Sequence, residues 1–262
     1  MNTPAHVKSA SRTLRLFQAF AEAGRPLSLS ELARALDIPR SSCLALLRTI
    51  ASKGFLCQVG PNAYYPTRML HDMARSIASH DPILERVIPV MTALRDRTKE
   101  TVILGKRQED QVIYLAVVES EQTIRYSARP GDFKPLHSTA SGKVLLAAMS
   151  DGERRRLLDR LRLTSVTPRT ITNVSALEEE LRAGVVRGWQ YAEGENVPDV
   201  IVLAAPVERN GEVYALVVTG PIHRMKGEVG RHAKALLEAC RRLDRDRSGP
   251  GATSRPQGEM AS

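Results

Sequence analysis

Residues 26–56, PLSLSELARALDIPRSSCLALLRTIASKGFL, contain two helix patterns separated by a tight turn. Ser28 and Glu31 form the S-x-x-E pattern of a capping box, which predicts that a first helix begins here. A second helix is predicted from Pro39, because proline suits the first turn of a helix, to Gly54, which suits a helix end. Two short helices joined by such a turn are typical of a helix-turn-helix motif.

The flanking residues extend this motif on both sides. TLRLFQAFAEAG, residues 13–24, has apolar residues at helical spacing and a glycine where helices commonly end. After the second helix, FLCQV (55–59) and AYYP (63–66) are expected to be short strands around a GPN turn. The order helix, helix, turn, helix, two-stranded ribbon predicts a winged helix-turn-helix domain over residues 1–66.

Positive charge is concentrated in this part of the chain. The protein has 262 residues and a formal net charge of +9. Residues 1–80 hold 10 Lys and Arg against 4 Asp and Glu, a net charge of +6, whereas residues 81–244 have a net charge of +2. A small basic domain with this motif indicates nucleic-acid binding. Taken alone, the charge could equally belong to a solvated arginine-rich surface.

The second helix of the motif would enter the major groove of DNA, which admits one α-helix. If Cys43, Leu46, Leu47 and Ile50 face inward, the opposite face is free to meet DNA. Arginine can bind phosphate or guanine, serine can donate to phosphate, and apolar side chains can contact a thymine methyl. A helical hairpin used for protein contacts is the alternative. The DNA contacts predicted on this face are Arg40, Ser41, Ser42, Leu44, Ala45 and Arg48.

The rest of the chain predicts a second, larger domain. Residues 67–81 read as a linker helix whose apolar stripe needs a partner. Over residues 82–244, strands occur as hairpins with helices grouped between them, which predicts an α+β fold with a mostly antiparallel sheet. TIRYSA (123–128) is expected to be one of these strands, and Asn210-Gly211 predicts a tight hairpin between the last two. The tail, residues 245–262, is expected to be disordered.

HSTASGK, residues 137–143, is the motif of the larger domain that most resembles an active site. It does not form a phosphate loop, because Val144 replaces the hydroxyl residue and His137 replaces the first glycine. A hydrolase that uses Ser138 or Ser141 is an alternative, but nothing in the sequence fixes its acid. We favour a helix start, whose unpaired N–H groups and positive dipole end suit a carboxylate ligand.

Several other classes of site receive no support from the sequence. Cys43, Cys57 and Cys240 are far apart and odd in number, so neither a disulfide framework nor a zinc site is predicted. No apolar run is long enough to span a membrane, and residues 1–17 show no signal peptide. We therefore expect a cytoplasmic protein with no metal, no cofactor, no catalytic residues and no membrane contact.

Residues 9–56 and the blocks RPGDFKPLHSTASGKVLLA, TPRTITNVSALEEELRAGVVRGW and VLAAPVERNGEVYALVVTGP resemble the IclR family of bacterial transcription regulators. The resemblance extends from about Lys8 to Leu243. It implies a winged helix-turn-helix, a dimerising linker helix and a GAF-like effector domain. It therefore implies a ligand-responsive regulator that binds double-stranded operator DNA as a homodimer or tetramer. Further DNA contacts expected outside the second helix of the motif are Arg12, Ser28, Tyr65 and Arg68.

The resemblance also implies an effector pocket for small organic acids. Its members are the helix start, whose N–H groups meet the effector, and polar positions on the strands. In this chain the matching residues are Ala140, Ser141, Ala192, Glu193, Val202, Val217 and Thr219. Three of the family's polar positions are apolar here, at Ala192, Val202 and Val217, so we expect a larger and more apolar acid, for example an aromatic one. A domain that only dimerises is the alternative.

Overall fold

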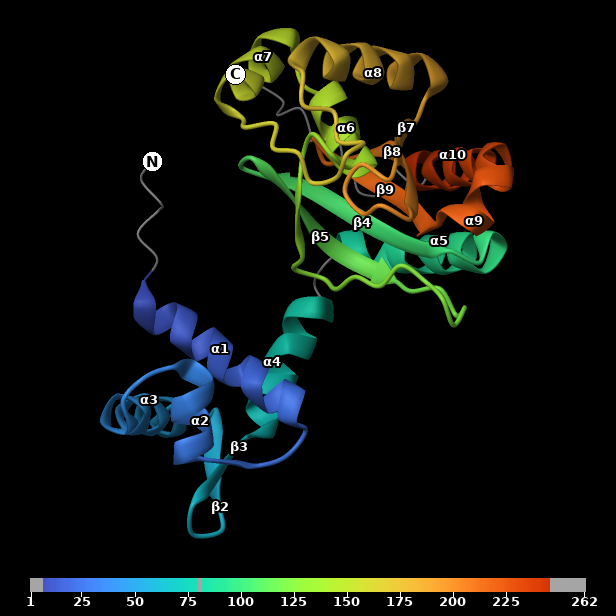
Figure 1. Cartoon of the computed structure of the whole chain (residues 1–262). Coiled ribbons are helices and arrows are strands. Elements are labelled where there is room, and N and C mark those ends of the chain that lie inside the picture. The colour runs from blue at the N-terminus through green and yellow to red at the C-terminus, as the bar shows by residue number, and fades with distance from the viewer. Residues whose placement is uncertain (1–6, 80–81, 246–262) are drawn as a thin grey trace, which may run out of the picture. The chain divides into compact units, whose positions relative to one another are not determined.

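The computed structural model describes residues 7–79 and 82–245, which form two compact units divided between Asp81 and Pro82 (Figure 1). Among these residues, no helix is both long enough and apolar enough to cross a membrane. The predicted disordered tail falls on residues 246–262, outside the described residues. Its first residue, Arg245, was assigned wrongly, because it is the last residue of a helix that packs on the second unit.

The first unit is the predicted winged helix-turn-helix. Its elements follow the chain in the order α1 (Lys8–Ala23), β1 (Leu27–Ser28), α2 (Leu29–Leu36), α3 (Arg40–Ser52), β2 (Leu56–Val59), β3 (Ala63–Pro66) and α4 (Arg68–Ser79). The ribbon differs from the prediction because it has three strands, in the order β1-β3-β2. The side chain of Leu27 is buried in the core. The backbone at Leu27 and Ser28 is extended and pairs with β3, which makes the third strand.

Two local features position the helices of this unit. The capping box forms as predicted: Ser28 Oγ accepts a hydrogen bond from the Glu31 backbone N–H at 3.3 Å, and the Glu31 carboxylate accepts one from the Ser28 N–H at 2.8 Å. The buried face of α1 consists of Leu16 and Phe20, whereas Leu14, although at helical spacing, is 66% exposed. Helical spacing alone did not distinguish these two faces.

The second unit is an α+β domain. Its sheet has six strands in the order β6-β5-β4-β9-β8-β7, and every neighbouring pair is antiparallel, as predicted. Its elements are α5 (Pro82–Thr98), β4 (Thr101–Gln108), β5 (Gln111–Val118), β6 (Phe133–Pro135), α6 (Ala140–Ala147), α7 (Asp151–Arg160), α8 (Val174–Arg187), β7 (Gln190–Glu193), β8 (Val200–Arg209), β9 (Glu212–Pro221), α9 (Ile222–Met225) and α10 (Val229–Arg245).

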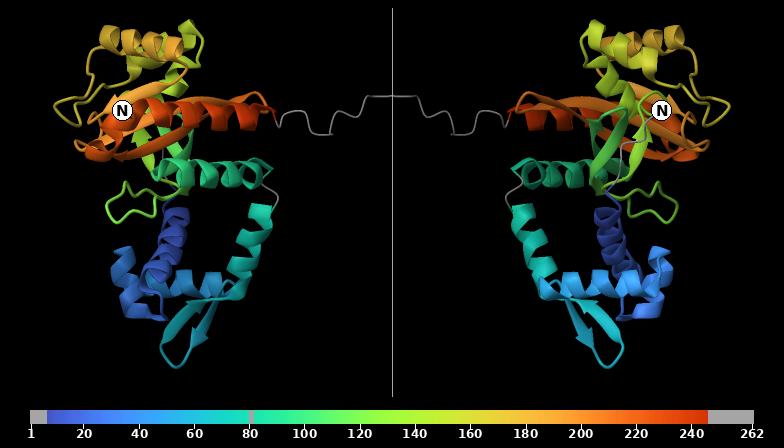
Figure 2. Two further views of the ribbon diagram at one scale, coloured as in Figure 1. Left: turned by 90° about the vertical axis from the view of Figure 1, so that its right-hand side faces the viewer. Right: turned by 90° about the vertical axis from the view of Figure 1, so that its left-hand side faces the viewer.

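Helices cover both faces of this sheet, α5 and α10 on one face and α6, α7 and α8 on the other (Figures 1 and 2). The alternation of side chains along the strands separates two cores. On β4, for example, Val102 and Leu104 pack toward α5 and α10, whereas Ile103 packs toward α6. The face under α6 is the one that contains the predicted pocket.

Two strand predictions had different outcomes. Asn210 and Gly211 form the tight turn between β8 and β9, with φ of 52° and 77°, the positive values that a two-residue hairpin turn requires. The strand predicted over residues 123–128 is absent, and the described edge of β5 pairs with β6 at Gln111, Val112 and Ile113. That segment is held by side chains: Thr101 Oγ1, for example, donates to the Tyr126 carbonyl at 2.6 Å.

Candidate functional site

The face of α3 predicted to meet DNA is open to solvent. Cys43, Leu47 and Ile50 are buried beneath the helix, and Leu46 is half-buried. On the opposite face, five of the predicted contacts are exposed and Leu44 is half-buried. The exposed five are Arg40, Ser41, Ser42, Ala45 and Arg48.

The first turn of α3 is suited to an anion. It begins after Pro39 with no side-chain cap, and it contains no acidic residue. Within the described residues, no ion pair engages the guanidinium of Arg40 or Arg48. Both charges, and the positive end of the helix, therefore remain available to an external phosphate.

The predicted contacts outside α3 differ in their availability. The Ser28 hydroxyl donates to Glu31 Oε2, at 2.7 Å, and accepts from its N–H, so it caps α2, and its contact with DNA stays a prediction. Tyr65, on β3, is 39% exposed and packs edge-on against Phe20, with ring centroids 6.1 Å apart. Arg68 is exposed and lies 3.5 Å from Asp72. The half-buried residue Arg12 lies on α1.

The linker helix α4 carries an exposed apolar stripe. Met69, Met73 and Ile77 recur at four-residue spacing, and all three are exposed. An amphipathic helix is expected to cover such a stripe with a partner.

A small cavity of the second unit lies beside the start of α6. Its open volume is about 20 Å³, enough for one water molecule. Larger open clefts, of about 410 and 680 Å³, lie over α7 and contain none of the predicted pocket residues. The cavity is lined by Tyr114, Tyr126, Ser138, Thr139, Ala192, Glu195, Asn196, Val197, Val200, Val202 and Thr219.

Three of the predicted pocket residues line this cavity together. Ala192 on β7 is paired with Val202 on β8, and Val202 is paired with Thr219 on β9, so the three side chains form a row across the sheet. Ala140 and Ser141 are fully buried in the first turn of α6, next to the lining residue Thr139.

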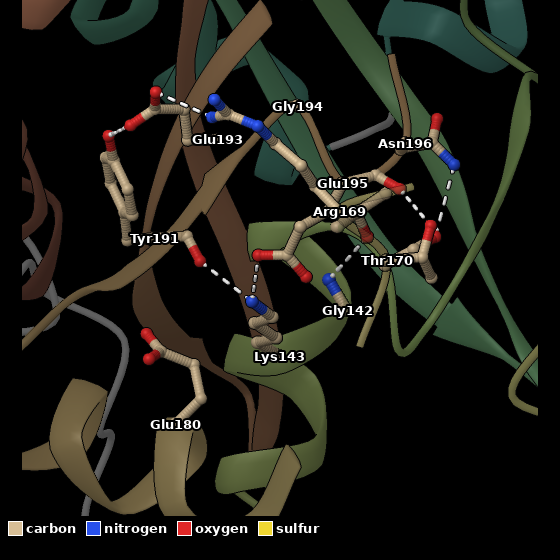
Figure 3. Close-up of polar contacts among 12 residues, drawn as sticks. Gly142, Lys143, Arg169, Thr170, Glu180, Tyr191, Glu193, Gly194, Glu195 and Asn196 are labelled. Carbon is tan, nitrogen blue, oxygen red and sulfur yellow. Dashed lines mark hydrogen bonds and ion pairs between the residues drawn. The ribbon is translucent and has the colours of Figure 1, made fainter. Parts of the chain in front are cut away.

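Two of the predicted pocket residues lie elsewhere, and the prediction is corrected for both. Glu193 follows Ala192 on β7 and therefore points to the opposite face, where its carboxylate accepts hydrogen bonds from Tyr191 Oη and Arg169, at 2.7 and 2.8 Å (Figure 3). Val217 shares a face with Thr219, but it is buried in the core under α6 and does not line the cavity.

The glycine and the lysine of HSTASGK both have structural partners. A Cβ at Gly142 would lie 2.1 Å from the Leu136 carbonyl oxygen, so only glycine allows this close approach. Lys143 is fully buried, and its Nζ donates to Glu195 Oε1 at 2.5 Å and to the Tyr191 carbonyl at 3.0 Å (Figure 3). Burial raises the pKa of Glu195, and Lys143 opposes this shift.

Sequence reasoning did not find Glu195, because its role depends on Lys143, which is 52 residues away in the chain. The sequence offered one signal of an acidic partner, a lysine directly before the apolar run that begins at Val144. A residue that does not line the cavity holds the loop that carries Glu195: Thr170 Oγ1 donates a hydrogen bond to the Glu195 carbonyl at 2.7 Å. Across the cavity mouth, Asn196 Nδ2 donates to Ser138 Oγ at 3.2 Å.

The serines of the motif are not arranged as nucleophiles. His137 Nε2 donates to the Thr164 carbonyl at 2.9 Å, which matches a structural histidine. Ser141 Oγ donates to Thr139 Oγ1 at 3.2 Å, and no histidine is hydrogen-bonded to Ser138 or Ser141 within the described residues. Among those residues, no group of three potential ligands could hold a metal ion.

Comparison with known proteins agrees with this architecture. Residues 9–60 match the family described as IclR helix-turn-helix domain, and residues 75–245 match the family described as Bacterial transcriptional regulator IclR C-terminal. The chain is 31% identical over 221 residues to the probable transcriptional regulator SauR of Cupriavidus necator, which is 83% of this chain and 87% of that protein.

Solved structures share the fold. IclR of Thermotoga maritima has a TM-score of 0.77 at 24% identity, covering 92% of this chain and 99% of its own. An IclR homolog of Microbacterium hydrocarbonoxydans, complexed with 4-hydroxybenzoate, has a TM-score of 0.74 at 23% identity, covering 92% and 100%. An exposed α3, a buried cavity beside α6 and these matches lead to one conclusion: the chain belongs to the IclR family of bacterial transcriptional regulators, with a helix-turn-helix DNA-binding domain and a C-terminal effector domain.

Proposed function

We propose that this protein is a cytoplasmic regulator without a catalytic role, which binds operator DNA as a homodimer or tetramer. Its affinity for operator DNA rises or falls when a small organic acid occupies the cavity beside α6. In this proposal, residues 1–66 bind DNA, residues 67–81 link the domains, and residues 82–244 bind the effector. One observation carries this proposal: the chain has an exposed, basic, uncapped helix start in one unit and a buried helix start in the other.

The DNA-binding part rests on α3. Arg40 and Arg48 provide two charges that form no ion pair with the described residues, while Ser41, Ser42 and Ala45 supply small side chains that let the helix approach base edges. The wing residue Tyr65 and the basic residues Arg12 and Arg68 are candidates for contacts to the DNA backbone. Dimerisation through the apolar stripe of α4 would present two copies of α3 to paired half-sites.

The effector part rests on the start of α6. The backbone N–H groups of Ala140 and Ser141 have no partner within the helix, because they belong to its first turn. Such groups suit a carboxylate. The other walls favour an apolar or aromatic body, since Ala192, Val202 and the rings of Tyr114 and Tyr126 line the cavity.

The cavity must open to admit such an acid. Its volume of about 20 Å³ is far below that of an aromatic acid, so the cavity walls have to move apart when a ligand enters. A ligand that binds the open form alone shifts the protein toward that form. A coupling of about 1–3 kcal/mol to DNA binding would change operator affinity several-fold to about a hundredfold.

Fluorescence anisotropy on DNA from upstream of the protein's own gene and its divergent neighbour tests this function. We expect nanomolar affinity that exceeds the affinity for scrambled DNA by about a thousandfold, with a shift when an effector acid is added. Equal, weak and steeply salt-dependent binding to both DNAs would contradict operator recognition, because charge alone gives that result.

A further inference from the structure

The carboxylate of Glu195 has an oxygen that no described residue serves. Oε1 accepts a hydrogen bond from Lys143, whereas Oε2 is buried and receives none. Glu195 is only 8% exposed and lines the cavity beside Val197 and Val200. In Figure 3 the carboxylate oxygen that no dashed line joins to Lys143 lies on the side of Gly142. The unserved oxygen therefore belongs to a residue of the cavity wall.

No contact among the described residues accounts for this unserved oxygen. A buried carboxylate is stabilised only when its cation and further hydrogen bonds together offset the loss of hydration. Lys143 donates a second hydrogen bond to the Tyr191 carbonyl rather than to Glu195 Oε2. A molecule that enters the cavity lies beside Glu195, whose Oε2 can accept a hydrogen bond, and close to a helix start whose N–H groups can donate them.

We propose that the effector is a hydroxy acid whose hydroxyl group donates a hydrogen bond to Glu195 Oε2 while its carboxylate lies against the start of α6. The inference rests on the proposed function, because it names the class of acid that the same cavity takes. Glu195 is then the residue that selects hydroxylated acids over their unsubstituted analogues.

A hydroxyl fits this position better than an ammonium group. Lys143 already neutralises the Glu195 carboxylate, so a second cation would be buried without a counter-charge of its own. A neutral O–H group adds the missing hydrogen bond without adding charge, and O–H donors make short, strong hydrogen bonds to carboxylates. An analogue without the hydroxyl would leave Oε2 unpaired, which is the costly arrangement.

Isothermal titration calorimetry on the full chain with matched pairs of acids tests this selection. The pairs are 4-hydroxybenzoate with benzoate, 4-hydroxyphenylacetate with phenylacetate, and 3-hydroxybutyrate with butyrate. We expect at least one hydroxy acid to bind about tenfold or more tightly than its partner, as a hydrogen bond to a charged group provides. Equal affinity within every pair would overturn the inference.

Glu195→Gln provides the decisive variant. Glutamine keeps an oxygen for Lys143 but replaces Oε2 by an amide N–H₂ group, which donates rather than accepts. We expect the preference for the hydroxy acid to fall to about onefold or to reverse, because two donors then face each other. Glu193→Gln is the matched control, since its carboxylate lies on the other face of the sheet, and it should keep the wild-type preference.

The outcomes separate this inference from the proposed function. If acids bind but the hydroxyl makes no difference, Glu195 does not select the ligand, and the effector function stands. If no acid of either kind binds, the inference and the effector part of the function both fail, while anisotropy still decides operator binding. If Glu195→Gln does not fold, the preference of the wild-type protein within each pair decides the question.

Discussion

The first turns of α3 and α6 are helix ends of the same kind in opposite surroundings. Neither contains an acidic residue, so both present the positive end of a helix. α3 begins after Pro39 without a side-chain cap and is exposed, whereas α6 begins after Thr139, whose hydroxyl caps Gly142, and is buried from Ala140 to Leu146. An exposed helix end can bind an external anion by its charge and shape. A buried helix end can bind only a ligand that fits between the side chains around it.

This difference predicts how each site responds to mutation. Side chains on the exposed face of α3 contact nothing that the fold needs, so changing them should alter DNA affinity and leave stability intact. Side chains around α6 are part of the core, so changing them should alter stability and ligand affinity together.

The largest effect is expected for Lys143→Met. It would leave the Glu195 carboxylate buried without its cation, which should destabilise the second unit by about 3–5 kcal/mol. Urea unfolding followed by the fluorescence of Trp189, the only tryptophan in the chain, reports on this unit alone. The double variant Lys143→Met/Glu195→Leu should recover most of the loss, because apolar replacement of a whole buried pair is often neutral. An unchanged midpoint in the single variant would contradict the prediction.

Arg48→Ala is expected to weaken DNA binding by about 1–3 kcal/mol if the guanidinium contacts a base, and to lower the salt slope by about one if it contacts phosphate. Circular dichroism should show unchanged unfolding, since Arg48 is exposed. Arg182→Ala, on the exposed side of α8, is the control that removes the same charge elsewhere. Equal anisotropy curves for the two variants would show that net charge, not the α3 face, binds DNA.

Ser28→Ala should cost the first unit about 1 kcal/mol, because it removes the N-cap of α2. Circular dichroism should detect the loss, while the Trp189 transition stays in place. Ser30→Ala, on the exposed side of the same helix, is the control and should have little effect. A loss of DNA affinity without a loss of stability would instead restore Ser28 as a DNA contact.

The same contrast explains which features of the structure could be predicted from the sequence alone. The capping box, the turn before α3 and the Asn210-Gly211 hairpin are local, so the sequence alone predicted them. The exposed face of α3 followed from helical periodicity, and five of its six predicted contacts are exposed. These features depend only on residues a few positions apart.

The pocket beside α6 depends on residues that are far apart in the chain. Tyr114 and Glu195 lie on opposite sides of the motif in sequence, and both line the cavity. Glu193 was misplaced because one residue along a strand reverses the face, and Val217 because α6 covers one end of its strand. The strand predicted at residues 123–128 does not form, and β6, from further along the chain, pairs with β5 instead. No local pattern contains this information.

The smallest expected effect concerns pH and the start of α2. Hydrogen bonds from Arg25 and Ser28 lower the pKa of Glu31 from 4.5 to about 2. The folded state thus favours the ionised carboxylate, so its contribution to stability is present above about pH 4.5 and is lost as the pH falls through about 2. Glu31→Gln should therefore flatten the acid dependence of the first unit, measured by circular dichroism, relative to Glu22→Gln on α1. Parallel curves for the two variants would mean that the exposed capping box acts through hydrogen bonding alone. The contrast with Lys143 and Glu195 would then be clearer, because removing one charge would cost stability only where it leaves the other charge buried without its partner.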